Sequence, residues 1–86
     1  MSKEIIVFSG VWCSSCKVWK KMLESNGVEY TEVDIDTDEG TTLATKHQVR
    51  SLPSTLVMVD GYVEQKYVGS QTQKVVDEIK EMLSGS

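Results

Sequence analysis

The chain has 86 residues, which is enough for one small domain, spanning residues 1–86, and too few for two. Its composition, 40% hydrophobic and 26% charged, is that of a globular protein, and no apolar run approaches the roughly 18 residues of a membrane span. The formal net charge of -4 argues against nucleic-acid partners, because contacts with phosphate need clustered Lys and Arg. The N-terminal residues lack the apolar segment and cleavage site of a signal peptide, so we expect a cytoplasmic protein.

The first half of the chain predicts a strand, a helix and a second strand. Residues 3–9 hold a near-continuous apolar run, which is typical of a strand buried on both faces. Residues 13–25 place apolar side chains at helical spacing, with Trp19 on the core-facing stripe, and the Asn-Gly pair at 26–27 ends this helix. Residues 28–36 alternate between polar and apolar side chains, which predicts a second strand and completes a βαβ unit.

The second half predicts a helix, a hairpin and a final helix. Asp60-Gly61 is the strongest short-range signal for a hairpin turn, and Leu52-Pro53 breaks the chain before that hairpin. Residues 84–86 have the composition of a frayed end. The predicted elements are a helix from Thr37 or Asp38 to about Gln48, strands at 54–59 and 62–68, and a helix at about 72–83. The element order is therefore βαβαββα, which places the chain in the α/β class.

The two cysteines lie three positions apart, where the first predicted strand leads into the first helix. A bridge between them closes too short a loop to be a useful structural staple, so the spacing favours a reactive role. Unpaired N–H groups and the positive end of the helix dipole should lower the pKa of Cys13 from about 8.5 toward about 7 or below. Cys16, one turn further on, should point into the apolar interior and stay protonated until a mixed disulfide forms. Cys13 is thus the predicted attacking thiol and Cys16 its resolving partner.

Two other interpretations of the cysteine pair stay open. One is a pair of buried, inert cysteines that share this spacing by chance. The other is a zinc site, but zinc needs four ligands, and the chain adds only His47 in a different predicted helix, so a second chain would have to complete the site. The position between a strand and a helix favours the reactive pair over both, and we expect no metal.

Four landmarks in the right order resemble the thioredoxin superfamily over nearly the whole chain. They are the active-site segment Trp12-Cys13-Ser14-Ser15-Cys16-Lys17, the loop Val49-Arg50-Ser51-Leu52-Pro53-Ser54-Thr55, the hairpin turn Asp60-Gly61 and the strand end Val68-Gly69. A Ser-Ser pair stands where thioredoxins usually have Gly-Pro. The resemblance implies a minimal thioredoxin fold with a four-stranded mixed sheet and three helices, at the reduced size typical of glutaredoxins.

The resemblance also implies a substrate-binding surface around the cysteines. Pro53 is expected to follow a cis peptide bond and to face the cysteines, with the backbone near Leu52 pairing with bound substrate as a short strand. Gly69, at the end of the last strand, is expected on the same surface. Trp12 is expected to shield the Cys13 thiolate and to form part of a flat surface for protein substrates.

The chain departs from thioredoxins at positions that assist proton transfer. Val7 stands where they keep a buried aspartate, and Glu32 stands where they place a lysine. We therefore hypothesise that Glu32 acts as a substitute base for Cys16, although the simpler interpretation of a solvated strand residue is favoured. Lys17 either adds positive potential beside Cys13 or is an ordinary solvated lysine.

The segment after the last predicted strand bears on the source of electrons. Glutaredoxins carry a Gly-Gly pair and an aspartate there to hold glutathione. This chain has Gly69-Ser70-Gln71-Thr72 instead, and its polar side chains are better interpreted as a helix cap. The segment therefore favours a thioredoxin over a glutaredoxin.

The leading hypothesis is a thioredoxin-type protein disulfide reductase, with no bound cofactor beyond its redox-active disulfide. As the resemblance implies, electrons would come from NADPH through a flavin-dependent thioredoxin reductase and pass to protein disulfides, such as those of ribonucleotide reductase or a peroxide-handling enzyme. A glutaredoxin recharged by glutathione is one alternative, and a non-catalytic binding module, as in some viral polymerase assemblies, is another. We expect a monomer that binds neither nucleic acid nor membranes.

Overall fold

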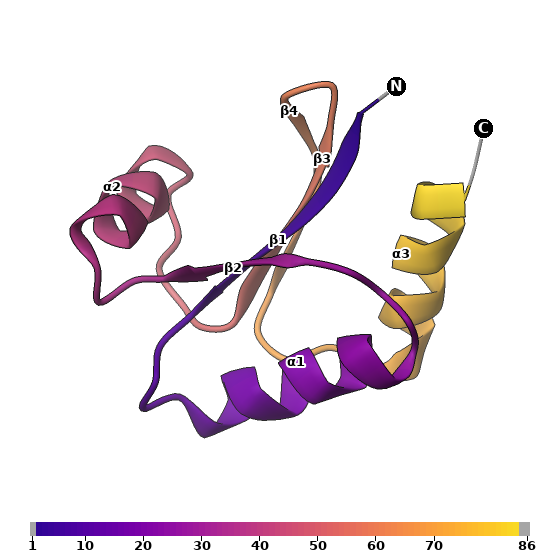
Figure 1. Cartoon of the computed structure of the whole chain (residues 1–86), viewed down its shortest axis with the longest axis horizontal. Coiled ribbons are helices and arrows are strands. Elements are labelled where there is room, and N and C mark those ends of the chain that lie inside the picture. The colour runs from indigo at the N-terminus through magenta and orange to yellow at the C-terminus, as the bar shows by residue number, and fades with distance from the viewer. Residues whose placement is uncertain (1, 85–86) are drawn as a thin grey trace.

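A four-stranded mixed sheet lies at the centre of the computed structural model, which describes residues 2–84 (Figure 1). The strands lie in the order β2-β1-β3-β4, with β1 parallel to β2 and the other neighbouring pairs antiparallel. This arrangement confirms the predicted βαβαββα order and the mixed sheet, while two residues of the predicted frayed end, 85–86, lie outside the described part. The elements are β1 (Lys3–Ser9), α1 (Ser14–Ser25), β2 (Thr31–Asp34), α2 (Asp38–Lys46), β3 (Ser54–Val59), β4 (Tyr62–Val68) and α3 (Gln73–Ser84).

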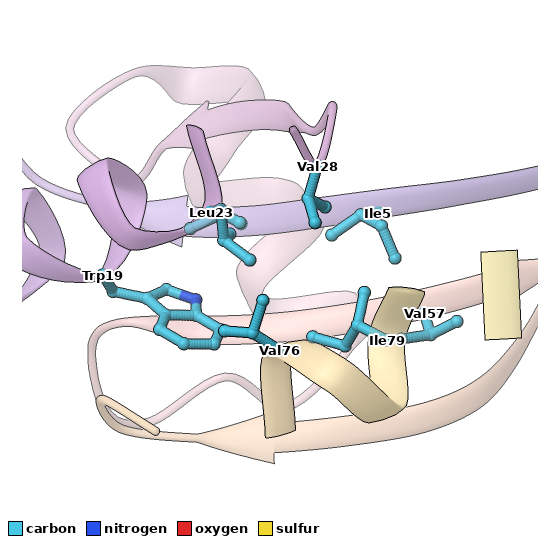
Figure 2. Close-up of a cluster of buried hydrophobic side chains, with 8 residues drawn as sticks. Ile5, Trp19, Leu23, Val28, Val57, Val76 and Ile79 are labelled. Carbon is cyan, nitrogen blue, oxygen red and sulfur yellow. The ribbon is translucent and has the colours of Figure 1, made fainter. Parts of the chain in front are cut away.

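The helices cover both faces of the sheet, with α1 and α3 on one face and α2 on the other (Figure 1). Successive side chains of a strand point to opposite faces, so Val7 packs with the α1 and α3 side while Phe8 packs with the α2 side. This two-sided packing explains the apolar run of β1, which lies inside the sheet between β2 and β3. The larger core cluster, drawn in Figure 2, contains Ile5, Val7, Trp19, Leu23, Val28, Val57, Val76 and Ile79.

The turn after β2 ends the strand early and passes close to α2. β2 is shorter than the predicted strand at 28–36, since it begins only at Thr31. At its other end, the N–H of Thr37 donates back to the carbonyl of Asp34 at 3.2 Å and turns the chain out of the sheet. The same carbonyl leaves no room for a side chain on α2, since a Cβ added to Gly40 would collide with its oxygen. The glycine that lowers helix propensity here is therefore required by the preceding turn.

The two ends of α2 follow from local backbone signals. The Thr37 hydroxyl accepts a hydrogen bond from the N–H of Gly40 at 2.9 Å, so Thr37 is the N-cap, one of the two predicted cap residues. The helix ends at Lys46 and not at Gln48 as predicted. Gln48 has a positive φ of 56°, which lies outside the right-handed helical region.

The start of β1 is fixed to two distant parts of the chain. The N–H of Ser2 donates to Asp60 Oδ1 at 2.8 Å, and the N–H of Asp60 donates to the Ser2 carbonyl at 2.7 Å. The Lys3 ammonium donates to the carbonyl of Met82, near the end of α3, at 2.8 Å. Asp60 and Gly61 both have positive φ, 53° and 86°, which confirms the predicted hairpin turn.

Candidate active site

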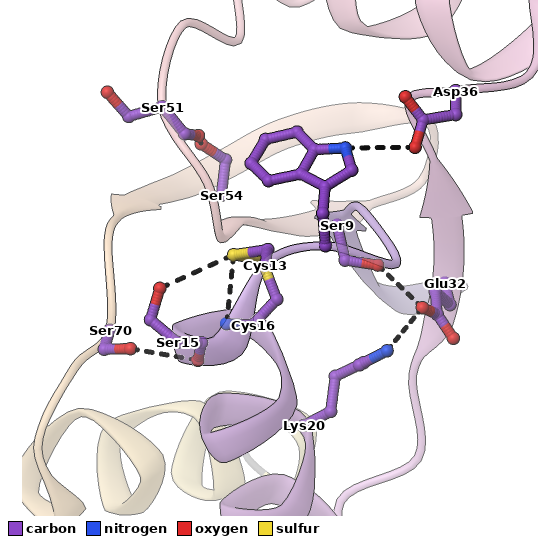
Figure 3. Close-up of a disulfide and its surroundings, with 11 residues drawn as sticks. Ser9, Cys13, Ser15, Cys16, Lys20, Glu32, Asp36, Ser51, Ser54 and Ser70 are labelled. Atoms are coloured by element: carbon purple, nitrogen blue, oxygen red, sulfur yellow. Dashed lines mark hydrogen bonds and ion pairs between the residues drawn. A yellow bond between two sulfur atoms is a disulfide. The ribbon is translucent and has the colours of Figure 1, made fainter.

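The connection between β1 and α1 delivers Cys13 to the start of the helix (Figure 3). The N–H of Cys13 donates to the Gly10 carbonyl at 3.0 Å, which closes a turn after β1, and Cys13 is the N-cap residue of α1. Its sulfur accepts a hydrogen bond from the N–H of Cys16 at 3.2 Å. A backbone donor and the positive end of the helix thus both face this sulfur, an arrangement that stabilises a thiolate. Lys17 is exposed in the first turn of the same helix.

Cys13 and Cys16 are joined by a disulfide across the first turn of α1, with their Cα atoms 5.3 Å apart. Cys13 keeps 7% of its surface exposed, whereas Cys16 is fully buried. Another molecule can therefore approach the first sulfur and not the second. This bonded pair differs from the alternative of two separate, inert thiols.

A groove of about 610 Å³ opens beside Cys13, between the start of α1, α2 and the loop that precedes β3. Trp12 and Cys13 line it from the active-site turn, Thr45 from α2, and Arg50 and Leu52 from the loop. The fold therefore brings two of the predicted substrate-binding residues to the predicted attacking thiol.

The loop before β3 contains the cis peptide bond between Leu52 and Pro53 that the resemblance implied. Pro53 is buried, and its carbonyl accepts a hydrogen bond from the N–H of Gly69 at 2.7 Å. The hydroxyl of Ser54 donates to the carbonyl of Ser51 at 2.6 Å across the loop. Leu52, Pro53 and Gly69 are thus fixed relative to one another, and their roles toward substrate stay predictions.

Trp12 is 65% exposed beside the dithiol, and its indole N–H donates to Asp36 Oδ2 at 3.1 Å (Figure 3). The ring also lies against Gly10, where an added Cβ would be 2.9 Å from a ring atom. Asp36 follows β2, and because β2 runs parallel to β1, the carboxyl ends of the two strands meet at the same edge of the sheet. Asp36 was not among the predicted site residues, although its place just after a strand parallel to β1 is the signal that points to this edge.

Glu32 lies opposite Val7 in the register of β1 and β2, so the two positions that depart from thioredoxins are neighbours. Its carboxylate accepts hydrogen bonds from the Lys20 ammonium and the Ser9 hydroxyl, both at 2.6 Å (Figure 3). These donors, Lys20 above all, hold the pKa of Glu32 below its usual range. A carboxylate stabilised in this way is a weaker base, which favours an ion-paired strand residue over a base for Cys16.

The segment after β4 is tied to the start of α1. The Ser70 hydroxyl donates to the carbonyl of Ser15 at 3.2 Å, and the Gln71 side-chain amide donates to the Val68 carbonyl at 2.7 Å. Ser70 and Gln71 therefore make structural bonds to backbone carbonyls within the protein.

Within residues 2–84, no group of three or more His, Cys, Asp or Glu side chains is placed to hold a metal ion. No helix of the same residues is long and apolar enough to cross a membrane.

The chain is similar to thioredoxins in both sequence and structure. A family model described as Thioredoxin matches residues 1–81. The thioredoxin of Staphylococcus aureus is 32% identical over 80 aligned residues, which cover 88% of this chain and 77% of that protein. Among solved structures, the germline-specific thioredoxin Deadhead of Drosophila melanogaster is 18% identical, with a TM-score of 0.81 over 94% of this chain and 81% of that one. Oxidised mitochondrial thioredoxin 3 of Saccharomyces cerevisiae is 25% identical, with a TM-score of 0.73 over 92% and 77%.

The family match extends over nearly the whole chain, and the geometry supplies the chemistry that the family requires. A tryptophan precedes a cysteine at the start of a helix, and that cysteine is bonded to a second cysteine one turn on. The redox-active group is this Cys13–Cys16 disulfide, so the chain is a thiol–disulfide oxidoreductase with disulfide reductase activity. It belongs to the thioredoxin family.

Proposed function

We propose that this protein reduces the disulfides of other proteins, with Cys13 as the attacking thiolate and Cys16 as the resolving thiol. The observation that carries this assignment is the difference in exposure, since Cys13 borders the groove and Cys16 is fully buried. The N–H of Cys16, 3.2 Å from Cys13 Sγ, supports a thiolate on the first cysteine before it attacks.

In the proposed cycle, the Cys13 thiolate attacks one sulfur of a substrate disulfide, forms a mixed disulfide and releases the other substrate sulfur as a thiolate. Cys16 then loses its proton and attacks Cys13 Sγ, which releases the second substrate sulfur. Two electrons have passed to the substrate, and the protein is left with the Cys13–Cys16 disulfide. An external dithiol must return two electrons before the next cycle.

The residues proposed to contact the substrate are Trp12 and Leu52, which line the groove, together with Pro53 and Gly69. Trp12 offers an exposed aromatic face beside Cys13. Leu52 lines the groove, and the loop that holds it is bonded through Pro53 to Gly69. An extended substrate segment can pair with backbone near Leu52 while its disulfide lies against Cys13 Sγ.

Lys17 and Glu32 are proposed only as modulators. Lys17 is exposed in the first turn of α1, so solvent screens its effect on the dithiol. Glu32 would accept the proton of Cys16 only after its bonds to Ser9 and Lys20 rearrange. Replacement by glutamine tests this role: if Glu32 is the base, Glu32→Gln shifts the pH dependence of the resolving step, and if it is a strand residue, that dependence is unchanged.

The source of electrons is proposed to be NADPH, acting through a flavin-dependent thioredoxin reductase. The family match supports this route over glutathione, and Ser70 and Gln71 already bond to backbone carbonyls where a glutaredoxin would hold its ligand. Proposed substrates are oxidised protein dithiols, such as those of ribonucleotide reductase or a peroxide-handling enzyme. We further propose that the protein works as a monomer in the cytoplasm, where thiols are kept reduced.

The experiment that tests this function follows NADPH consumption while a test protein disulfide is reduced. One arm recharges the protein with thioredoxin reductase, and the other uses glutathione with glutathione reductase. Each arm compares the wild type with Cys13→Ser and Cys16→Ser. We expect turnover in the thioredoxin reductase arm only. Cys13→Ser should abolish it, and Cys16→Ser should stop at a mixed disulfide that mass spectrometry detects.

Other outcomes would redirect the assignment. Turnover only with glutathione would make the protein a glutaredoxin in function. If neither arm turned over, a dedicated reductase would be tested next. A binding module would then be shown by partner binding that survives Cys13→Ser, because docking does not need the thiol.

A further inference from the structure

Two donors surround the sulfur of Cys13. One is the N–H of Cys16 at 3.2 Å, and the other is the hydroxyl of Ser15, whose oxygen is 3.5 Å from Cys13 Sγ (Figure 3). Because Cys13 Sγ is bonded to Cys16 and carries no proton, the Ser15 hydroxyl must be the donor in this contact. Among residues 2–84, it is the only side chain that forms a hydrogen bond with Cys13.

The position of Ser15 is held from outside the helix. Its carbonyl accepts a hydrogen bond of 3.2 Å from the hydroxyl of Ser70, which lies between β4 and α3 (Figure 3). A bond from a residue 55 positions away fixes the first turn of α1 at the residue whose side chain faces the sulfur. The preceding residue, Ser14, is exposed, and within the described residues its side chain makes no such contact with the dithiol.

We propose that the Ser15 hydroxyl is a positioning donor that sets the redox balance of the Cys13–Cys16 pair, with Ser70 holding it in place. A hydrogen bond to a thiolate is roughly twice as strong as one to a neutral sulfur. The hydroxyl therefore stabilises the reduced, thiolate state more than the disulfide state in which it is seen. It shifts the equilibrium toward the dithiol and makes the pair easier to reduce.

This inference rests on the proposed role of Cys13 as the thiolate, and it concerns an equilibrium and not turnover. Where thioredoxins usually have a proline, which has no side-chain donor, this chain has Ser15, whose hydroxyl lies beside the sulfur. The contact thus gives a physical account of what the second serine of the Cys-Ser-Ser-Cys segment does. The first serine provides a matched control of the same residue type.

The test is the equilibrium between the protein dithiol and glutathione disulfide, measured by alkylation and mass spectrometry for the wild type, Ser15→Ala, Ser15→Thr, Ser14→Ala and Ser70→Ala. We expect Ser15→Ala to shift the equilibrium constant about fivefold toward the protein disulfide, about 20 mV for two electrons. Ser15→Thr, which keeps the hydroxyl, should restore most of the wild-type value. Ser70→Ala should shift it the same way by a smaller factor, and Ser14→Ala by less than about twofold.

The pH dependence of Cys13 alkylation provides a second readout. Its midpoint should move to higher pH in Ser15→Ala and stay in place in Ser14→Ala, with circular dichroism showing that each variant is folded. The inference is overturned if Ser15→Ala and Ser14→Ala behave alike in both measurements. A wild type that equilibrates with glutathione but fails to reduce protein disulfides would defeat the proposed function and leave this inference standing.

Discussion

The indole N–H of Trp19 donates a 2.7 Å hydrogen bond to the hydroxyl of Thr55, and both side chains are fully buried. Trp19 lies on α1, on the turn after Cys16, and Thr55 lies on β3, just beyond Pro53. This bond ties the helix that carries the dithiol to the strand that follows the cis peptide bond. Apolar spacing predicted Trp19 in the core but gave no sign of its partner.

We expect Thr55→Val to lower the free energy of unfolding by about 1–3 kcal/mol, because a nearly unchanged shape leaves the Trp19 N–H buried without a partner. Urea denaturation at neutral pH measures this change. In the double variant with Trp19→Phe, no polar group of the pair is left unpaired, so the combined cost should be smaller than the sum of the single costs by about 1 kcal/mol. Strictly additive costs would show that the bond contributes nothing.

Gly40→Ala should destabilise the protein by about 3 kcal/mol, although alanine is the better helix former. In an open helix this substitution stabilises by about 1 kcal/mol, but here the added Cβ meets the carbonyl of Asp34 and forces the turn to move. Thr42→Ala, in the same helix, is the control and should change stability by less than about 0.5 kcal/mol. Thermal or urea unfolding shows whether Gly40→Ala lowers or raises the stability of the protein. A more stable Gly40→Ala variant would contradict the packing argument.

The stability advantage of the wild type over Glu32→Gln should depend on pH. Lys20 and Ser9 depress the pKa of folded Glu32 below its ordinary value of 4.5, so the folded carboxylate adds stability above that pH, and the contribution is lost as pH falls through the folded pKa. The side chain is 44% exposed, so solvent screening keeps the advantage below about 1 kcal/mol at neutral pH. Urea titrations at neutral pH and at about pH 3 should show it shrinking in acid. An equal difference at both pH values would count against the ion pair.

Asp36→Ala should impair the reduction of protein disulfides more than that of small ones. Asp36 holds the exposed Trp12 ring beside the dithiol, and we expect its loss to lower kcat/KM for a protein disulfide by about fivefold, the value of one hydrogen bond. A small aliphatic disulfide makes little use of that ring, so its rate should change by less than about twofold. Asp38→Ala removes a nearby exposed carboxylate as the control. Equal losses with both substrates would mean that Asp36 acts on the dithiol itself.

The features that could be predicted from the sequence are those set by neighbouring residues. The cysteine pair at a helix start, the Asp60-Gly61 turn and the apolar run of β1 all depend on local pattern, and each is found where it was predicted. The cis bond before Pro53 was implied by family resemblance and not by any local rule, since most bonds before proline are trans.

The contacts that could not be predicted join residues far apart in the sequence. The Asp36 contact with Trp12 and the Ser9 contact with Glu32 depend on the parallel register of β1 and β2, which no pattern within either strand specifies. The end of β2 was missed for a different, local reason, because the turn at Asp34 takes the chain out of the sheet while the alternation of side chains continues. The sequence therefore indicates the reactive cysteine pair, whereas the residues that surround this pair come together only in the folded chain.

The start of β1 and the end of α3 lie together, joined by the bond from Lys3 to the Met82 carbonyl, at the far end of the sheet from the turn that carries Cys13 (Figure 1). A tag, a tether or a fused domain attached at either terminus would therefore extend away from the reactive sulfur. The protein can be anchored to a bead or an electrode through its ends with the dithiol facing outward, which makes it a convenient immobilised disulfide reductant.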